Sequence, residues 1–406
     1  MSRAPARPGY DAIVDLHPPR AVPDMAYALA KFTYRISHGA CVLTKGEPLF
    51  HDFRDPKVQP PLLPGSEFWP CKYQTDVVVK GEAFAPGGRP TQTMQVSVTV
   101  GGATKRIQVL GRRTVQWDSR GKPRLGTPEP FTRMPITYDR AYGGADQRVS
   151  VRSGALTVGD LERLRADHPG LYPRNPFGKG YLVLPDPTPG IELPNLEDPE
   201  DLLTPERLIV GDPALWHRQP LPMGFDYTNP LMFPRYVYLG LDAWFTPPQG
   251  SSLAEIRRGW LPLNYRRRYG TQIDPTRPAS FRYYQEGSLG MVFPALPPGT
   301  PMVVRGLHPE QPELRFPVPP EPRMAIVIEG QRQNLKPQLC NLLLEPARNQ
   351  MSVVYAVRTK KLPRVFIAGI HGHIPLAVII EDDAPVVYDT PPTIREQLLA
   401  AQAGGG

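Results

Sequence analysis

The stretch from Lys72 to Trp117 limits the fold of this chain more than any other, because its residues fit a run of short strands. Val77–Val79 is a β-branched run followed closely by Gly81, which is typical of a buried strand. Apolar and polar residues alternate from Met94 to Val100, the period of a strand with one solvated face. Gly101-Gly102 follows at once and suits a two-residue hairpin turn. The stretch therefore predicts an antiparallel β-meander.

Proline is frequent along the whole chain and limits the number of helices. It accounts for 53 of the 406 residues, against a typical share of about 5%. Because proline lacks a backbone donor and breaks helix interiors, we expect few helices, with candidates at Asp160–Asp167 and 393–402. The chain is 40% hydrophobic, which is enough to build a core. We predict a mainly β fold, β-rich with a few short helices and long ordered proline-rich loops around an antiparallel meander or sandwich-like body.

The distribution of proline and of strand patterns also predicts the domain organisation. Residues 1–24 are rich in proline and arginine and are expected to form a flexible N-terminal arm. Residues 25–388 are expected to form a single large β-rich domain, with closing strands at about 324–380. Within it, an irregular proline-rich lobe spans about 145–260, and its aromatic content favours order because long structureless loops are uncommon in compact domains. Residues 389–406 form a C-terminal tail.

Charge and cysteine content exclude several classes of protein. The net charge of +8 is modest for 406 residues and identifies no acidic partner. Cys41, Cys71 and Cys340 are an odd number without short spacing, so neither a disulfide framework nor a CxxC metal site is predicted. The first residues contain no apolar signal-peptide core, and no window approaches eighteen apolar residues. These features predict a soluble cytoplasmic protein.

His371 and His373 form the sequence feature that most resembles a catalytic site. Residues two apart share a face of a strand, so both imidazoles could bind one metal ion there. Oxygen ligands are available nearby at Glu381, Asp382 and Asp383. In the competing interpretation, the histidines lie in a glycine-containing turn and the acids cap a strand edge. A metal-dependent enzyme therefore remains an alternative function.

The segment from Arg257 to Tyr284 combines arginine with aromatic residues. It includes Trp260, Tyr265, Arg266, Arg267, Arg268, Tyr269, Arg282, Tyr283 and Tyr284. Arginine pairs with phosphates while aromatic rings stack on bases, so single-stranded nucleic acid is one possible ligand. The same residue types are enriched as anchors in protein interfaces. A solvated basic loop is the third interpretation, and the sequence leaves all three open.

Signatures of other enzymes are absent from the sequence. No GxSxG elbow, HExxH pair or phosphate-binding glycine pattern occurs, and the Gly87-Gly88 and Gly143-Gly144 pairs are expected to be turns. Asp139, Glu197 and Glu286 are carboxylates that nothing in the sequence pairs for acid–base chemistry. We therefore expect a protein that is not an enzyme and needs no cofactor.

Six sequence blocks occur in a fixed order between residues 75 and 225. They are TDVVVKGEAFAPGGRP (Thr75–Pro90), KRIQVLGRRTVQW (Lys105–Trp117), PFTRMPITYDRAYGG (Pro130–Gly144), NPFGKGY (Asn175–Tyr181), LPNLEDP (Leu193–Pro199) and PMGF (Pro222–Phe225). This order resembles a bacterial domain-of-unknown-function family associated with type VI secretion. The resemblance extends from about Met25 to Pro317, and the strands near Leu344–Val357 are similar to the closing segment of that family.

The resemblance implies a function in binding rather than catalysis. Members are encoded beside the VgrG spike and PAAR or PAAR-like tip proteins, and are regarded as adaptors or chaperones that load effectors onto the spike. This chain departs from the family pattern at Tyr238–Trp244 and in the basic segment that follows, so its cargo preference is expected to differ. The residues expected to contact the partner are Phe177, Tyr181, Trp260, Tyr265, Arg266, Arg267 and Arg268.

Overall fold

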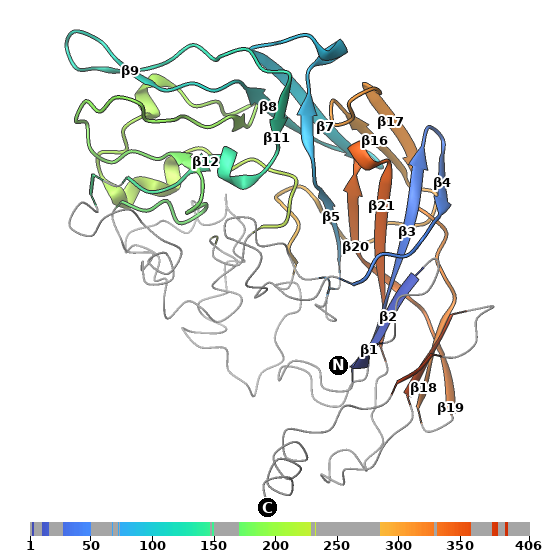
Figure 1. The fold of residues 1–406 in the computed structure, drawn as a ribbon. Helices are drawn as coiled ribbons and strands as arrows, with labels where there is room; N and C mark the ends of the chain where they lie inside the picture. Colours follow the sequence, from blue (N-terminus) through green and yellow to red (C-terminus); the bar gives the residue numbers. More distant parts are fainter. Residues whose placement is uncertain are drawn as a thin grey trace, which may run out of the picture.

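The fold is mainly β, as the sequence predicts (Figure 1). In the computed structural model, the described residues are 2–3, 10–15, 27–49, 67, 72, 74–146, 148–149, 170–228, 232, 285–328, 331–358, 376–380 and 386–388. Within these ranges the helical segments are short 3₁₀ turns. They are η1 (Pro86–Gly88), η2 (Tyr138–Arg140), η3 (Pro205–Arg207), η4 (Pro213–Arg218) and η6 (Pro346–Arg348).

The first sheet has eight strands in the order β1-β2-β3-β21-β20-β5-β15, with β4 also paired to β3. The strands are β1 (Ser2–Arg3), β2 (Tyr10–Asp15), β3 (Tyr27–Ser37), β4 (Ala40–Leu43), β5 (Thr75–Val79), β15 (Val292–Phe293), β20 (Gln338–Glu345) and β21 (Gln350–Arg358). All neighbours are antiparallel except β5 and β20, which run parallel. Two of the strands, β1 and β2, lie within the segment expected to be an arm.

The second sheet has five antiparallel strands in the order β14-β8-β7-β16-β17. The strands are β7 (Thr93–Val100), β8 (Ala103–Leu110), β14 (Leu196–Glu197), β16 (Pro301–Arg305) and β17 (Glu313–Pro317). The turn between β7 and β8 is Gly101-Gly102, with Val100 paired to Ala103, as the sequence predicts. Gly101 has φ of 58°, a left-handed conformation that glycine adopts without strain.

The two sheets pack face to face and form a sandwich (Figure 1). Alternate residues of β7 and β8 point inward and are fully buried, which explains the period of two in the sequence. They meet aliphatic residues of the first sheet, including Val77 and Val79 of β5 and Leu342 and Leu344 of β20. The other face of the first sheet is also covered, because Leu29 of β3 packs with Leu49 and Cys340 in a separate small cluster. The central strands β3, β20 and β21 of the first sheet are therefore buried on both faces.

The structure divides the predicted meander between sheets. Strands include the residues where the sequence places them, but β5 lies in the first sheet while β7 and β8 lie in the second. Between them, β6 (Glu82–Phe84) pairs with β11 (Arg133–Pro135). The parallel partner of β5 is β20, more than 250 residues later in the chain. Because β5 is buried on both faces, it fits a central strand rather than the edge of a meander.

A region of irregular chain lies beside the second sheet, and we call it the loop lobe (residues 111–146, 148–149 and 170–220). Its regular elements are short pairs of strands. They are β9 (Val115–Trp117) with β10 (Pro123–Leu125), and β12 (Tyr142–Gly143) in parallel with β13 (Lys179–Gly180). The buried hydrophobic cluster of the loop lobe includes Val115 and Tyr142. Both precede residue 145, where the sequence places the start of this lobe.

A third sheet of four strands has the order β19-β18-β22-β23. The strands are β18 (Met324–Ile328), β19 (Gln331–Leu335), β22 (Leu376–Ile380) and β23 (Val386–Tyr388). The described strands within 324–380 are β18, β19, β20, β21 and β22, and they contribute to two sheets. The predicted helices at Asp160–Asp167 and 393–402 fall outside the described residues. No helix in the described ranges is long and apolar enough to cross a membrane.

Candidate interaction site

Two of the six sequence blocks interlock in the loop lobe through glycine and asparagine. Asn175 is fully buried, and its Nδ2 donates to the carbonyl oxygens of Tyr138 (2.7 Å) and Tyr142 (3.1 Å). A Cβ on Gly178 would lie 2.5 Å from the carbonyl oxygen of Ala141, so only glycine allows β12 and β13 to approach this closely. The blocks Pro130–Gly144 and Asn175–Tyr181 are thus packing motifs.

An aromatic cluster forms the centre of the loop lobe. The ring of Tyr172 lies 5.2 Å from that of Tyr142, 5.3 Å from that of Tyr181 and 6.2 Å from that of Trp216 (centroid distances). Its hydroxyl donates to the carbonyl oxygen of Pro220 (2.8 Å). Burial raises the pKa of all three phenols, so each remains a neutral hydrogen-bond donor. The cluster holds the irregular chain together.

The residues predicted to contact a partner are placed differently by the structure. Tyr181 is only 2% exposed and belongs to the aromatic cluster, so its ring does not reach the surface in this conformation. Phe177 is half-buried at the turn before β13. The remaining ones fall outside the described residues: Trp260, Tyr265, Arg266, Arg267 and Arg268. Phe177 and Tyr181 therefore lie in the same segment, but Phe177 is half-buried at a turn and Tyr181 is buried in the aromatic cluster.

A buried ionic cluster ties β5 to the segment that precedes β15. The Nζ of Lys72 lies 2.7 Å from Asp76 Oδ2 and 3.0 Å from Glu286 Oε2. Gln285 Nε2 donates to Asp76 Oδ1 (2.8 Å), and the backbone N–H of Glu286 donates to Asp76 Oδ2 (2.8 Å). The three charged side chains are at most 1% exposed. Because every charge has a partner, the cluster is a structural junction.

Asp139, Glu197 and Glu286, the carboxylates considered for acid–base chemistry, each form an ion pair with a cationic side chain. Glu286 contacts Lys72 in the ionic cluster, and Asp139 lies 3.4 Å from Arg140. Glu197 forms a buried ion pair with Arg113. Burial raises the pKa of Glu197, and Arg113 acts in the opposite direction. The Asp139–Arg140 pair joins neighbouring residues of one loop, whereas the Glu197–Arg113 pair joins distant segments, and Glu197 also accepts from the backbone N–H of Leu203 (2.9 Å).

Lys105 in β8 of the second sheet is hydrogen-bonded to two loop residues, Gly224 and Ser288. Its Nζ donates to the carbonyl oxygen of Gly224 (2.6 Å) and to Ser288 Oγ (2.9 Å). Burial lowers the pKa of Lys105 to about 7, and Asp198 opposes this shift. An amine beside a serine hydroxyl can activate the serine as a nucleophile. Ser288, however, is fully buried, so a substrate cannot reach its hydroxyl in this conformation.

The predicted metal ligands His371 and His373 lie outside the described residues, as do the acids at 381–383. In the part of the chain that the structure describes, no group of three or more histidine, cysteine or acidic side chains could hold a metal ion. The histidine hypothesis therefore stays a prediction from sequence.

The strand β4 exposes apolar side chains at an open sheet edge. Val42 is 52% exposed and Leu43 is 51% exposed, the highest values among the large hydrophobic residues with described burial. The strand forms a hairpin with β3 through a two-residue turn at His38 and Gly39, as the sequence predicts. The turn is fixed by a backbone bond from Gly39 N–H to the carbonyl oxygen of Arg315 (2.6 Å) in β17. The edge is therefore held rigidly by both sheets of the sandwich.

The backbone of β4 has hydrogen-bonding groups directed away from β3. Thr44 N–H donates to the carbonyl oxygen of Thr33 in β3. In an antiparallel pair, successive residues direct their backbone N–H and C=O groups alternately towards the partner strand and away from it. By this alternation, the N–H and C=O groups of Cys41 and Leu43 face the open side. No described strand pairs with that side of β4. An apolar edge with unpaired backbone groups is a template for another strand.

Sequence reasoning could not identify this edge as the candidate site. The residues Ala40–Leu43 read as an apolar strand, and such a run is equally compatible with a buried strand. The polar residues Thr44 and Lys45, which follow directly, are the only signal that the strand ends at the surface. Exposure depends on which strands lie beside β4, and this is a property of the assembled sheet.

Comparison with known proteins gives one match. The family model described as an uncharacterized protein conserved in bacteria (DUF2169) matches residues 22–356, most of the chain. A search of curated proteins and a search of solved structures found no match.

Proposed function

The chain belongs to this bacterial family, DUF2169, and from this premise we propose that it is a non-enzymatic adaptor or chaperone for type VI secretion. In this proposal it binds an effector, or the PAAR-like domain of an effector, and assists its loading onto the VgrG spike. The binding takes place in the cytoplasm, before export. The secretion role is supported by the order of the six sequence blocks, and the binding role is supported by the surface of the sandwich.

The observation that carries the binding role is the open apolar edge of β4. Val42 and Leu43 are half-exposed there, and the outward backbone groups of Cys41 and Leu43 are available to a strand of the partner. Strand addition supplies main-chain hydrogen bonds for affinity and side-chain contacts for specificity. Because the hairpin is fixed to β17, the edge needs little reordering on binding.

The loop lobe supports the same proposal as a rigid surface. The polar residues of the sequence blocks in this lobe, such as Asn175 and Asn195, form hydrogen bonds within the protein, so the blocks maintain its shape. Loops on a rigid scaffold present broad binding surfaces. Phe177 and the segment Arg257–Tyr284 stay proposed as additional contacts to the cargo, with Trp260 and Tyr265 as aromatic anchors.

The test is an affinity purification of the full chain from its own bacterium, with mass spectrometry of the proteins that copurify. We expect a VgrG spike protein, a PAAR-like tip protein or a toxin. The double variant Val42→Lys with Leu43→Lys places two charges on the edge and should lower recovery at least tenfold.

The matched control is Thr104→Lys with Leu289→Lys. Leu289 is 42% exposed and Thr104 is also exposed, and both lie away from β4 and outside the loop lobe. The control should retain the copurifying proteins. The proposal fails if the wild type brings down none of these three classes. The role of β4 fails if both double variants recover cargo equally.

A further inference from the structure

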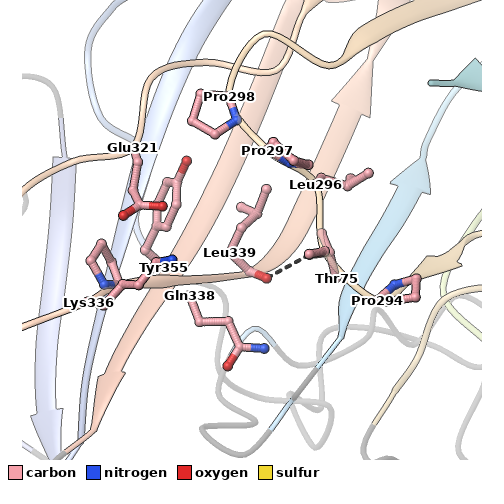
Figure 2. A pocket seen from close by; sticks show the side chains of 12 residues that line it. Thr75, Pro294, Leu296, Pro297, Pro298, Glu321, Lys336, Gln338, Leu339 and Tyr355 are labelled. Atoms are coloured by element: carbon pink, nitrogen blue, oxygen red, sulfur yellow. Dashed lines mark hydrogen bonds between the residues drawn. The ribbon is translucent and has the colours of Figure 1, made fainter.

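A hollow of about 560 Å³ lies where the three sheets approach one another (Figure 2). Its floor is formed by β5, β20 and β21 of the first sheet. One wall is the linker 294–298, which runs from β15 towards β16 of the second sheet. The opposite rim comes from Glu321, before β18, and from Lys336, after β19. Junctions between structural layers are common positions for ligand sites.

Two sides of this hollow carry apolar side chains on stiff chain segments. Figure 2 shows the rings of Pro297 and Pro298 on one side and the side chains of Leu339 and Tyr355 on the other. Proline has a fixed φ, so the linker wall has few alternative conformations. The floor is fixed because Thr75 Oγ1 donates to the carbonyl oxygen of Leu339 (2.8 Å). An apolar side chain would thus enter a hollow whose walls are already in place.

Tyr355 contributes a phenol to this hollow, beside the polar side chains of Gln338, Glu321 and Lys336. Burial raises the pKa of its phenol, and the neighbouring Tyr34 and Glu321 raise it further, so the hydroxyl remains a neutral donor. None of the described residues forms a hydrogen bond with this hydroxyl. Figure 2 shows the Tyr355 ring beside Glu321 at the edge of the hollow. Tyr355 is 2% exposed as a whole, but it lines the hollow, so the carbonyl or carboxylate oxygen of a ligand that enters the hollow could accept from its hydroxyl.

A second hollow of about 540 Å³ adjoins the first and is basic. The two share Glu321, Lys336 and Pro337. The second is also lined by Arg323 and Arg332, and Glu321 is the one carboxylate among its lining residues. Arg332 is oriented by a hydrogen bond from its Nε to Asn334 Oδ1 (2.8 Å). Arginine and lysine at the surface of a partly apolar depression complement an acidic ligand.

We propose that the two hollows form one binding site for an acidic peptide segment of a partner protein. A large apolar side chain of the segment occupies the hollow between Leu339 and Pro297, and a neighbouring Asp or Glu lies over Arg332 and Lys336. The Tyr355 hydroxyl donates to a carbonyl oxygen of the peptide. This site is separate from the β4 edge and does not depend on the secretion role.

The proposal is tested by selecting phage-displayed random 12-residue peptides on the immobilised full chain. The enriched peptides should carry an acidic residue next to a large apolar one. Their affinities are then measured by fluorescence anisotropy with synthetic labelled peptides. The variant Arg332→Glu with Lys336→Glu should bind at least tenfold more weakly, since both side chains are exposed and their reversal leaves the core unchanged. Tyr355→Phe should bind about fivefold more weakly.

The control for net charge is Arg89→Glu with Arg120→Glu, two exposed arginines outside both hollows. This control variant should bind the selected peptides as tightly as the wild type does. All variants should have melting temperatures within a few degrees of the wild type. The proposal is overturned if no peptide is enriched, if the enriched peptides lack acidic residues, or if both charge reversals weaken binding equally. Because the probes are synthetic peptides, these outcomes are independent of any secretion partner.

Discussion

The sandwich and the loop lobe are stabilised by different interactions. In the sandwich, aliphatic residues of long strands pack between two sheets, and Val77, Val96 and Leu342 are fully buried there. In the loop lobe, the strands have two or three residues, and the centre is a cluster of tyrosines around Tyr172. Hydrogen bonds from side chains to the backbone, such as those of Asn175, replace the sheet ladder.

The comparison shows how the same chain builds a rigid surface in two ways. Apolar contacts are non-directional, so the sandwich tolerates changes of side-chain shape as long as volume is kept. Hydrogen bonds and glycine contacts are directional, so the loop lobe depends on individual atoms. Substitutions in the two regions should therefore differ in effect even where the residues are equally buried.

The largest effect is expected at the buried ionic cluster of Lys72, Asp76 and Glu286 in the sandwich. If apolar packing alone held this region, Lys72→Met would be tolerated. Instead, removing the ammonium leaves Asp76 and Glu286 as buried carboxylates without their cation. We expect the free energy of unfolding to fall by about 3–5 kcal/mol, measured by urea denaturation.

The control for this prediction is Lys122→Met, because Lys122 lies at the surface. Its free energy of unfolding should stay within about 0.5 kcal/mol of the wild type. A loss below 1 kcal/mol for Lys72→Met would show that the cluster adds nothing to the apolar contacts around it.

The second prediction compares a glycine in each region. In the loop lobe, a Cβ on Gly178 would lie 2.5 Å from both Ala141 O and Asn175 Nδ2. In the sandwich, a Cβ on Gly102 would meet nothing within 4 Å. We expect Gly178→Ala to lower the free energy of unfolding by about 3 kcal/mol and Gly102→Ala to change it little. Equal effects in thermal melts would contradict the view that the loop lobe depends on close backbone approach.

The sequence predicts the strands of the sandwich well, because a period of two reflects burial on one face. The hairpins at Gly101-Gly102 and His38-Gly39 follow from turn residues and are confirmed. The division of β5 and β7 between two sheets was not predicted. That division depends on the pairing of Val77 with Leu342, and nothing local in the sequence encodes such a distant contact.

The loop lobe and the candidate sites were less predictable. Aromatic residues suit both an interface and a core, so the sequence could not separate Phe177, which is half-buried, from Tyr181, which is buried. The apolar hollow is assembled from Pro297, Leu339 and Tyr355, which come from separate segments. No periodicity links such residues, and only the packing of the sheets brings them together.

The third prediction concerns Lys105, which connects the sandwich to loops returning from both sides. Burial lowers its pKa from the ordinary 10.5 to about 7 in the folded protein. Between these values the unfolded chain binds a proton that the folded protein does not, so the free energy of unfolding rises with pH. We expect wild type to gain about 1 kcal/mol relative to Lys105→Met between pH 7.5 and 8.5, measured by urea denaturation at each pH. Parallel pH profiles for the two proteins would contradict the lowered pKa.

The smallest effect distinguishes the two regions most directly, because it compares one hydroxyl in each. In the loop lobe, the hydroxyl of Tyr172 donates to the carbonyl oxygen of Pro220 (2.8 Å). In the sandwich, the hydroxyl of Tyr34 has no hydrogen-bond partner among the described residues, although its ring is buried. Tyr172→Phe should therefore lower the free energy of unfolding by about 1 kcal/mol, whereas Tyr34→Phe should change it by less than about 0.5 kcal/mol. If denaturant titrations gave the two variants the same stability, directional hydrogen bonds would contribute no more to the loop lobe than to the sandwich. The difference between the two regions would then be one of shape alone.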